Sequence, residues 1–419
     1  MNLLMTARTA FALVLATVAL AACKRDADTT ARPANGDYVV QEWVLPAQPG
    51  SMAPDLSITP NGRVLLSWLN RQQGRRNALQ FAAYTADGGW QSQARTVAVG
   101  HSLMANGADT PHMLGTADGA LWMQWLQTSG ADAMAYDTVL ARSRDGGMTW
   151  TQITRVNDDQ AGGEHGFAAL WQRSSDAVGI AWLDGRSAGT HGEGAHAGAM
   201  QLRANSFDMN LERDADALLD ARVCDCCQTA VAMTDEGPLL VYRGRSADEV
   251  RDIQAIRFDG AAWSKPATVH ADGWKIEACP VNGPAVAARG MDAVVGWYTA
   301  AGDTPRVHLT RSKDAGGSFA APVTVDEGAA ALGRVAVALD TQQVWVAWLR
   351  AEGEQQSLML ARYSPDLSKQ LQRIEVARLQ ARGLASGIPK LAADAGGAWL
   401  VWTDVIDGAA DLQGVRVSR

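Results

Sequence analysis

The sequence predicts an all-β protein, a β-propeller of seven four-stranded blades, on three observations. A short apolar strand that ends in an aromatic residue recurs seven times along the chain. A turn rich in Asp, Asn and Gly precedes it, and stretches with the 3.6-residue period of an amphipathic helix are nearly absent. We therefore expect a ring of similar units rather than two unrelated domains.

The recurring strand has nearly continuous apolar character, as expected where neighbouring blades cover both faces of a strand. Its terminal aromatic residues, here called the anchors, lie 51 to 60 residues apart, a period typical of propeller blades. A pair of packed sheets would give no repeat with a fixed aromatic position. The anchors are Trp68, Trp125, Trp182, Tyr242, Trp297, Trp348 and Trp402.

Each repeat reads as a unit of four strands. A first apolar strand leads into a hairpin turn such as Asn61-Gly62, whose residue types tolerate positive φ, and the anchor strand follows. The last repeat stops after its third strand, at residues 412–417, whereas residues 38–45 form an unpaired strand at the start. We expect this N-terminal strand to supply the missing fourth strand and close the ring, because closure removes an exposed sheet edge.

Residues 1–22 read as an export signal, since Arg8 is followed by an apolar run at 11–22 that is too short to span a bilayer as a helix. The run ends in LAAC at residues 20–23, which resembles the lipobox of bacterial lipoproteins. The resemblance implies cleavage before Cys23, acylation of that residue and an anchor in the outer membrane of the cell envelope. We expect residues 23–37 to be the lipidated cysteine and a flexible tether, and residues 38–419 to be the propeller.

The composition bears on the partners of the protein. The formal net charge is −8, and the chain has no basic run or stripe of basic and aromatic residues, so we expect no nucleic-acid partner. The expected partners are a membrane, through the anchor, and a protein, glycan or metal ligand at the rim of the propeller.

Two further turns carry a specific motif. SRDGGMTW at 143–150 nearly matches the Asp-box pattern S-x-D-x-G-x-x-T-W, and SKDAGGSF at 312–319 matches it in part. The chain therefore resembles the sialidase superfamily and related Asp-box (BNR-repeat) propellers. The resemblance implies that the boxes stabilise turns between third and fourth strands, and it offers a six-bladed ring as the alternative to seven. The box residues are Ser143, Asp145, Gly147, Trp150, Ser312, Asp314, Gly317 and Phe319.

The catalytic residues that this resemblance implies are not matched. Sialidases use an arginine trio, a Tyr–Glu pair and an Asp acid/base, but the region that corresponds to their first arginine reads SMAPD at 51–55. Asp184 and Arg186 resemble the acid/base region, although D-G-R is more often a turn. We therefore expect no active sialidase. A different glycoside hydrolase stays the alternative, with two inward carboxylates drawn from Asp55, Asp109, Glu164 and Asp184.

The remaining cysteines group in the fourth and fifth repeats. Cys224 and Cys279 each lie 18 residues before the anchor of their repeat, which places both near the entry to an innermost strand. By the same register His165 lies at this rim, and the loop after the third anchor carries His191 and His196. We therefore expect a Cys/His group at the mouth of the central channel that also includes Cys226 and Cys227.

Several interpretations of this group stay open. An exported protein with an even number of cysteines favours structural disulfides. Thiolate and imidazole ligands instead suit a soft-metal or redox site for copper or zinc, although C-x-C-C is not a usual zinc spacing. Two further interpretations remain. The cysteines could be free thiols, and the histidines could belong to a surface loop. The sequence thus predicts a binding or scaffold module of the cell envelope, with an exo-acting glycoside hydrolase on envelope or host glycans as the alternative.

Overall fold

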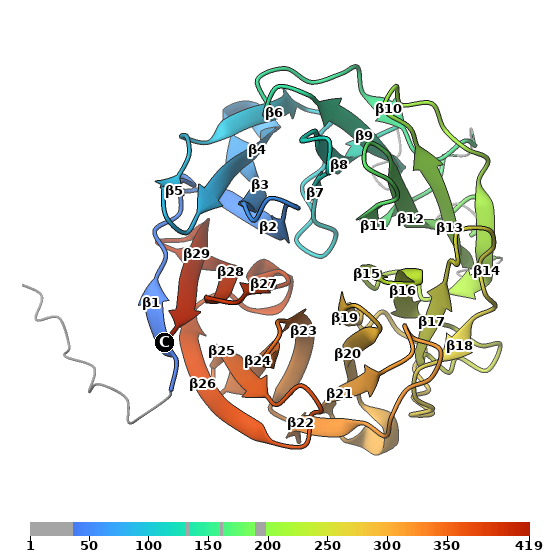
Figure 1. Ribbon diagram of the computed structural model, residues 1–419, viewed down its shortest axis with the longest axis vertical. Helices are drawn as coiled ribbons and strands as arrows, with labels where there is room; N and C mark the ends of the chain where they lie inside the picture. Colours follow the sequence, from blue (N-terminus) through green and yellow to red (C-terminus); the bar gives the residue numbers. More distant parts are fainter. Residues whose placement is uncertain (1–36, 131–134, 160–161, 189–197) are drawn as a thin grey trace, which may run out of the picture. The chain divides into compact units, whose positions relative to one another are not determined.

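The computed structural model describes residues 37–130, 135–159, 162–188 and 198–419, and these form seven antiparallel sheets around a ring (Figure 1). The seven-bladed propeller predicted from the repeat is confirmed, and the six-bladed alternative is wrong. Among the described residues the only helical segments are three short 3-10 turns, and none has the length or apolar character that a membrane crossing needs. They are η1 (Gln73–Arg75), η2 (Ala301–Asp303) and η3 (Gly383–Ser386).

In each blade the strands follow one another from the centre of the ring to its edge (Figure 1). The first blade consists of β2 (Ser51–Ile58), β3 (Val64–Gln72), β4 (Arg76–Thr85) and β5 (Gly89–Trp90), with β6 (Arg95–Gly100) also paired to β4. The second consists of β7 (His112–Gly115), β8 (Leu121–Thr128), β9 (Tyr136–Ser143) and β10 (Thr154–Arg155). The third consists of β11 (His165–Gln172), β12 (Val178–Asp184), β13 (Met200–Phe207) and β14 (Ala217–Val223).

The remaining blades repeat the same order. The fourth consists of β15 (Ala230–Thr234), β16 (Gly237–Arg243), β17 (Ile253–Arg257) and β18 (Ala267–Thr268). The fifth consists of β19 (Ala285–Arg289), β20 (Asp292–Thr299), β21 (Arg306–Ser312) and β22 (Val323–Glu327). The sixth consists of β23 (Ala331–Leu339), β24 (Val344–Glu352), β25 (Gln355–Tyr363) and β26 (Gln370–Leu379). The seventh consists of β27 (Lys390–Asp394), β28 (Gly397–Ile406), β29 (Ala409–Ser418) and β1 (Val39–Glu42).

The anchors hold the blades together. All seven lie on the second strand of their blade and are buried, five of them completely. The apolar clusters that contain them join adjacent blades. In one such cluster Trp345 of the sixth blade packs with Leu400 of the seventh. Burial of large apolar side chains at these boundaries, roughly 1.5–3 kcal/mol each, is what stacks the sheets into a ring.

The two ends of the chain close the ring, as the sequence predicts. Strand β1 pairs antiparallel with β29, with Val39 opposite Ser418 and Glu42 opposite Val415. Just before β1, the buried Tyr38 packs edge-on against Trp345, with ring centroids 5.2 Å apart. The N-terminal strand therefore supplies the fourth strand of the last blade.

Three innermost strands carry the same irregularity. The pairing register of β2, β11 and β23 shifts near its start, and at each shift a residue other than glycine has positive φ. These residues are Ala53 (φ 53°), Phe167 (φ 50°) and Arg334 (φ 54°). A bulge of this kind bends the strand and redirects side chains, and strained backbone of this sort often accompanies function. The bulges lie where the innermost strands begin.

The Asp-boxes lie between third and fourth strands, as expected from the resemblance. In the first box, Ser143 Oγ and Thr149 Oγ1 donate hydrogen bonds to the carboxylate of Asp145, and the amide of Gly147 donates to Ser143 Oγ. Gly147 has φ 85°, and a Cβ there would lie 2.2 Å from Phe81 of the preceding blade. Trp150 meets the same Phe81 ring edge-on. The box therefore both shapes its turn and fits it against a neighbour.

The second box corrects one residue assignment. The amide of Gly316, not that of the predicted Gly317, donates to Ser312 Oγ. Gly316 also has φ 86° and lies against Leu239 of the preceding blade, so it is the counterpart of Gly147. Asp314 accepts from Ser312 and Ser318 as Asp145 does in the first box. The prediction of Gly317 was wrong because the S-x-D-x-G spacing, counted from Ser312, leads to Gly316, just as it leads from Ser143 to Gly147.

Candidate functional site

A cavity of about 320 Å³ lies at the centre of the ring, between the innermost strands. Its wall is mostly aliphatic, with a few polar side chains contributed by different blades. A concave wall with a small number of converging polar groups is the usual form of a binding site. The polar side chains of the wall include Asp55, His112, Gln228, Arg334 and Lys390.

Asp55, a catalytic candidate from the sequence, lies in this wall on β2. Its carboxylate is 3.3 Å from His112 Nδ1 and 3.4 Å from Lys390 Nζ, and it accepts a hydrogen bond from the amide of Met113. Burial by itself would raise the pKa of Asp55, but the charges of His112 and Lys390 outweigh it and lower that pKa. His112 of the second blade and Lys390 of the seventh therefore keep the carboxylate of Asp55 ionised.

Asp109, in the loop before β7, has the opposite character. Burial raises the pKa of its carboxyl to about 6. Asp109 Oδ2 accepts a 2.6 Å hydrogen bond from the amide of Phe167, whereas Oδ1 is buried with no hydrogen-bond partner in the structure. Glycine at 166 makes room for it, since a Cβ there would lie 2.2 Å from Oδ2. Asp55 and Asp109, which both feel the charges of His112 and Lys390, thus have pKa values shifted in opposite directions, a pattern typical of acid/base pairs.

Next to Asp109 the candidate carboxylate Glu164 is paired with Tyr136, a residue that the sequence did not single out. The hydroxyl of Tyr136, on β9, donates to Glu164 Oε2 at 3.3 Å. Burial, together with the charges of Asp109 and Glu164, raises the pKa of the Tyr136 hydroxyl far above its usual value. The two residues are 28 positions apart in different blades, so only the fold brings them together.

The cavity wall holds two cations, Lys390, which pairs with Asp55, and Arg334. Its strained backbone is held by the amide of Arg334 donating to Asn282 Oδ1 at 2.6 Å. Its Nη1 donates to Ser386 Oγ and to the carbonyl of Gly387. Among the described residues no carboxylate pairs with this guanidinium, and burial lowers its pKa. A bound anion would offset the cost of burying such a cation.

The other two catalytic candidates, Asp184 and Arg186, belong to a separate group. Arg186 Nε and Nη2 donate to the two oxygens of the fully buried Asp184, and Trp182 Nε1 donates to the same carboxylate. His165 lies beside them, with Nε2 3.2 Å from Asp159 and Nδ1 3.1 Å from the carbonyl of Tyr136. We call Asp159, His165, Asp184 and Arg186 the acidic cluster. Its hydrogen-bonding groups are largely used within the protein.

The cysteines form a second group, the thiol cluster, which consists of Cys224, Cys226, Cys227 and Cys279. The Sγ atoms of Cys224, Cys226 and Cys227 all lie within 4.8 Å of one another. Cys279, from the loop before β19, lies close enough to Cys226 across the blade boundary for each thiol to shift the pKa of the other. All four are free thiols, and the Sγ atoms of Cys224 and Cys227 lie 3.4 Å apart. The equal register of Cys224 and Cys279 thus places them beside one another, but the contacts of His165 are with the acidic cluster.

Arginines surround the thiol cluster. Arg251 Nη1 donates to Cys224 Sγ at 3.3 Å. Hydrogen bonds from the Cys226 and Cys227 thiols, together with the charge of Arg243, hold the pKa of Cys224 well below its usual value. Burial raises the pKa of Cys227 to about 12. Cys224 is therefore the thiol of the group that most readily carries negative charge.

Three sequence-predicted site residues, Cys23, His191 and His196, lie outside the described residues.

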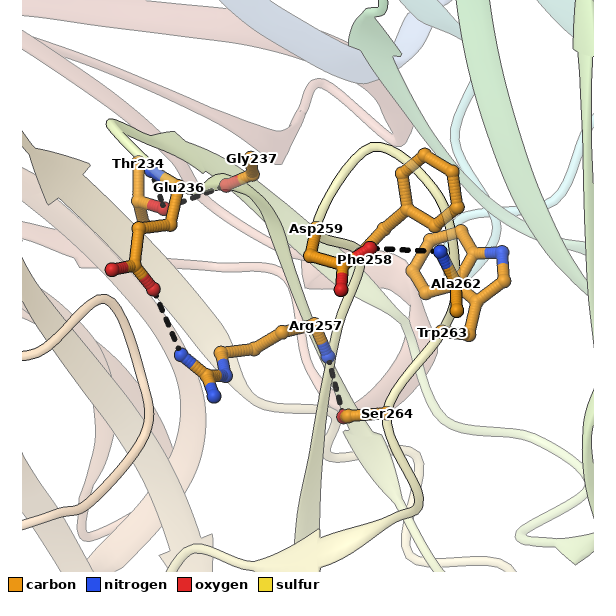
Figure 2. A pocket seen from close by; sticks show the side chains of 9 residues that line it. All are labelled: Thr234, Glu236, Gly237, Arg257, Phe258, Asp259, Ala262, Trp263 and Ser264. Carbon is orange, nitrogen blue, oxygen red and sulfur yellow. Dashed lines mark hydrogen bonds and ion pairs between the residues drawn. The ribbon is translucent and has the colours of Figure 1, made fainter.

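A second, smaller cavity of about 150 Å³ lies on the fourth blade, between the β15–β16 and β17–β18 turns (Figure 2). Its polar groups bond to one another. Arg257 pairs with Glu236 at 3.2 Å, and Asp259 accepts from the amides of Ala261 and Ala262. Because these groups already have partners, we regard this cavity as part of the turn structure.

Comparison with known proteins supports the fold and nothing finer. No family model matches the sequence, and no curated protein matches it. Among solved structures, phage phi92 endosialidase is similar with a TM-score of 0.50 and 10% identity, over 91% of this chain and 69% of that one. The NanB sialidase from Streptococcus pneumoniae has a TM-score of 0.45 and 8% identity, over 85% and 83%. An α-L-arabinofuranosidase from Fusarium graminearum has a TM-score of 0.43 and 11% identity, over 88% and 93%. At such identities the likeness concerns the propeller alone.

Proposed function

We propose that this chain is a lipid-anchored binding protein of the cell envelope whose propeller takes an acidic glycan into its central cavity. The observation that carries the proposal is Arg334, a cation on the cavity wall that is held by a strained bulge and paired with no carboxylate among the described residues. A carboxylate is the ligand group that a guanidinium binds best. We choose a glycan as the molecule that carries this carboxylate because the endosialidase has a similar fold.

The neighbouring wall fits such a ligand. The aliphatic strands offer apolar surface to a sugar ring, and the carboxylate of Asp55 offers hydrogen-bond acceptors to hydroxyl groups. Arg334 Nη1 is fixed by Ser386 and Gly387, so the guanidinium is already oriented before a ligand arrives. Preorganisation of this kind reduces the entropy lost on binding.

The test is glycan binding by the full chain. We expect binding to oligosaccharides that contain sialic or uronic acid and none to their neutral counterparts. Arg334→Ala should weaken binding by about 2–5 kcal/mol, because it removes the one buried partner of the carboxylate. Arg257→Ala, which removes an exposed arginine paired with Glu236, is the matched control and should bind as the parent does. Equal affinity of the Arg334 variant and the parent would refute the proposal.

The anchor is tested separately. The sequence pattern before Cys23 supports acylation, so radiolabelled fatty acid should enter the chain and be lost in Cys23→Ala. A labelled Cys23→Ala variant would contradict the lipid anchor and leave the cavity proposal untouched.

Glycoside hydrolysis is the second candidate, favoured by the opposed carboxyls Asp55 and Asp109. An acid that stays protonated up to about pH 6 and an ionised partner are what such a reaction needs. Turnover of a chromogenic glycoside would fall as pH rises above about 6, because Asp109 then loses its proton. Asp109→Asn should abolish turnover while leaving glycan binding in place. No turnover across a panel that includes sialosides and uronides would leave binding as the function.

A further inference from the structure

The thiol cluster carries an inference that is independent of the central cavity. We propose that this cluster binds a Cu(I) ion through its sulfur atoms. The ligands are Cys224, Cys226 and Cys227, with Cys279 completing or closing the site from the neighbouring blade.

The geometry fits one ion. Two sulfur atoms on the same ion are at most about 4.6 Å apart when each metal–sulfur bond is about 2.3 Å. The Sγ atoms of Cys224, Cys226 and Cys227 lie within 4.8 Å of one another, so only small side-chain adjustments separate the free thiols from a coordinated set. Cys224 and Cys227 are buried, which keeps competing water away from two of the ligands.

The backbone on both sides of the three cysteines is fixed. The amide of Cys224 donates to the carbonyl of Arg243, which joins the segment to strand β16. The side chain of Gln228, which follows Cys227 directly, donates to the carbonyl of Ala108 at 2.6 Å and accepts from the amide of Gly283 at 3.0 Å. The segment thus bridges the fourth blade to loops of two others. A ligand set held in this way is preorganised for a metal.

The surrounding charge also fits a thiolate site. Thiolates around a monovalent ion carry net negative charge, which must be offset when it is buried. Arg251 donates to Cys224 Sγ, and Arg243 is almost fully buried with hydrogen bonds only to backbone carbonyls. Among the described residues no carboxylate pairs with Arg243. The negative charge of the loaded site would supply the missing counter-charge.

The ligand set favours copper over zinc. An all-sulfur set selects soft ions, and Cu(I) is the softest of the common candidates. Structural zinc takes four tetrahedral ligands, usually as two pairs spaced by two to four residues, and Cys-x-Cys-Cys does not have that spacing. The one carboxylate inside the motif, Asp225, is turned to Arg245 at 2.9 Å.

The experiment is a Cu(I) titration of the full chain, purified and reduced without oxygen, against a chromogenic Cu(I) chelator. We expect about one Cu(I) per chain, and Cys224→Ser or Cys227→Ser should lower the affinity more than about 100-fold. Since both replaced thiols are buried, circular dichroism and thermal unfolding must show that the variants fold. The exposed Cys279→Ser, which the fold tolerates more easily, should lower the affinity less but measurably.

Asp225→Asn is the matched control, because it alters the same segment without removing sulfur. It should bind Cu(I) as the parent does, and a loss equal to that of Cys224→Ser would overturn the all-sulfur assignment. Two disulfides among the four cysteines in protein isolated from cells would also overturn the proposal. So would Zn(II) retained against an equal concentration of Cu(I).

Discussion

The thiol cluster and the acidic cluster are alike in the spacing of their possible metal ligands but differ in the bonds that those ligand atoms already make. Each brings three possible metal ligands within 4.8 Å of one another next to an arginine. In the acidic cluster, Arg186 and Trp182 occupy both oxygens of Asp184, and Asp159 contacts the ring of His165. In the thiol cluster the sulfur atoms contact mainly one another, and Arg243 has no acidic partner among the described residues.

This difference separates structural from functional groups more clearly than residue type does. Both oxygens of Asp184 are paired with a guanidinium, so a metal would have to displace a buried ion pair to reach them. In the thiol cluster only Cys224 contacts a guanidinium, through a single 3.3 Å contact from Arg251, so less is lost when an ion binds.

The largest effect is expected from breaking the acidic cluster. Arg186→Ala leaves the carboxylate of Asp184 buried without its cation, which should lower the free energy of unfolding by about 3–5 kcal/mol in urea denaturation. Asp158→Asn, which removes a more exposed partner of the same arginine, is the control and should cost about 1 kcal/mol or less. Similar small costs for both would mean that the acidic cluster is not a structural unit.

A smaller effect of opposite sign is expected from copper at the thiol cluster. At a free Cu(I) concentration 100-fold above its Kd, the free energy of unfolding should rise by about 2.7 kcal/mol. Arg186→Ala should show the same increase, because its cluster takes no part in binding, and Cys224→Ser should show none. Thermal unfolding with and without Cu(I) measures both. An increase that survives in Cys224→Ser would place the metal elsewhere.

The smallest effect concerns pH. Burial would raise the pKa of Asp184, but Arg186 outweighs it and lowers that pKa in the folded protein. The folded state therefore binds this proton less tightly than the unfolded state, and the stabilisation is present above the unfolded pKa of about 3.9. It is lost as pH falls through the lower folded value. The stability difference between the parent and Arg186→Ala should thus shrink below about pH 4, and a difference that is constant from pH 7 to pH 3 would contradict this.

Much of the fold follows from the sequence because the repeat is periodic. The anchors fix the second strand of every blade, and the orphan strand at residues 38–45 then has one unpaired edge to join. The same register places Cys224 and Cys279 on adjacent blades, since equal distances from an anchor mean equal heights in the ring.

The contacts of the site residues could not be predicted, because they depend on loops that do not follow the repeat. The register gives the blade and height of His165 but not its partner, and the partner proves to be Asp159 rather than a cysteine. Asp109 gives no local sign of its raised pKa, because burial by Gly166 and Phe167 comes from the next blade. Tyr136 and Glu164 meet for the same reason.

The pairing of β1 with β29 also sets when the last blade can form during synthesis. Residues 415–418 are synthesised long after their partners, residues 39–42, so a copy that stops before them cannot complete this blade. Such a copy would display the unpaired edge of β1 and the aromatic face of Tyr38, the kind of surface that quality-control proteases and chaperones recognise. Ring closure thereby distinguishes finished molecules from fragments.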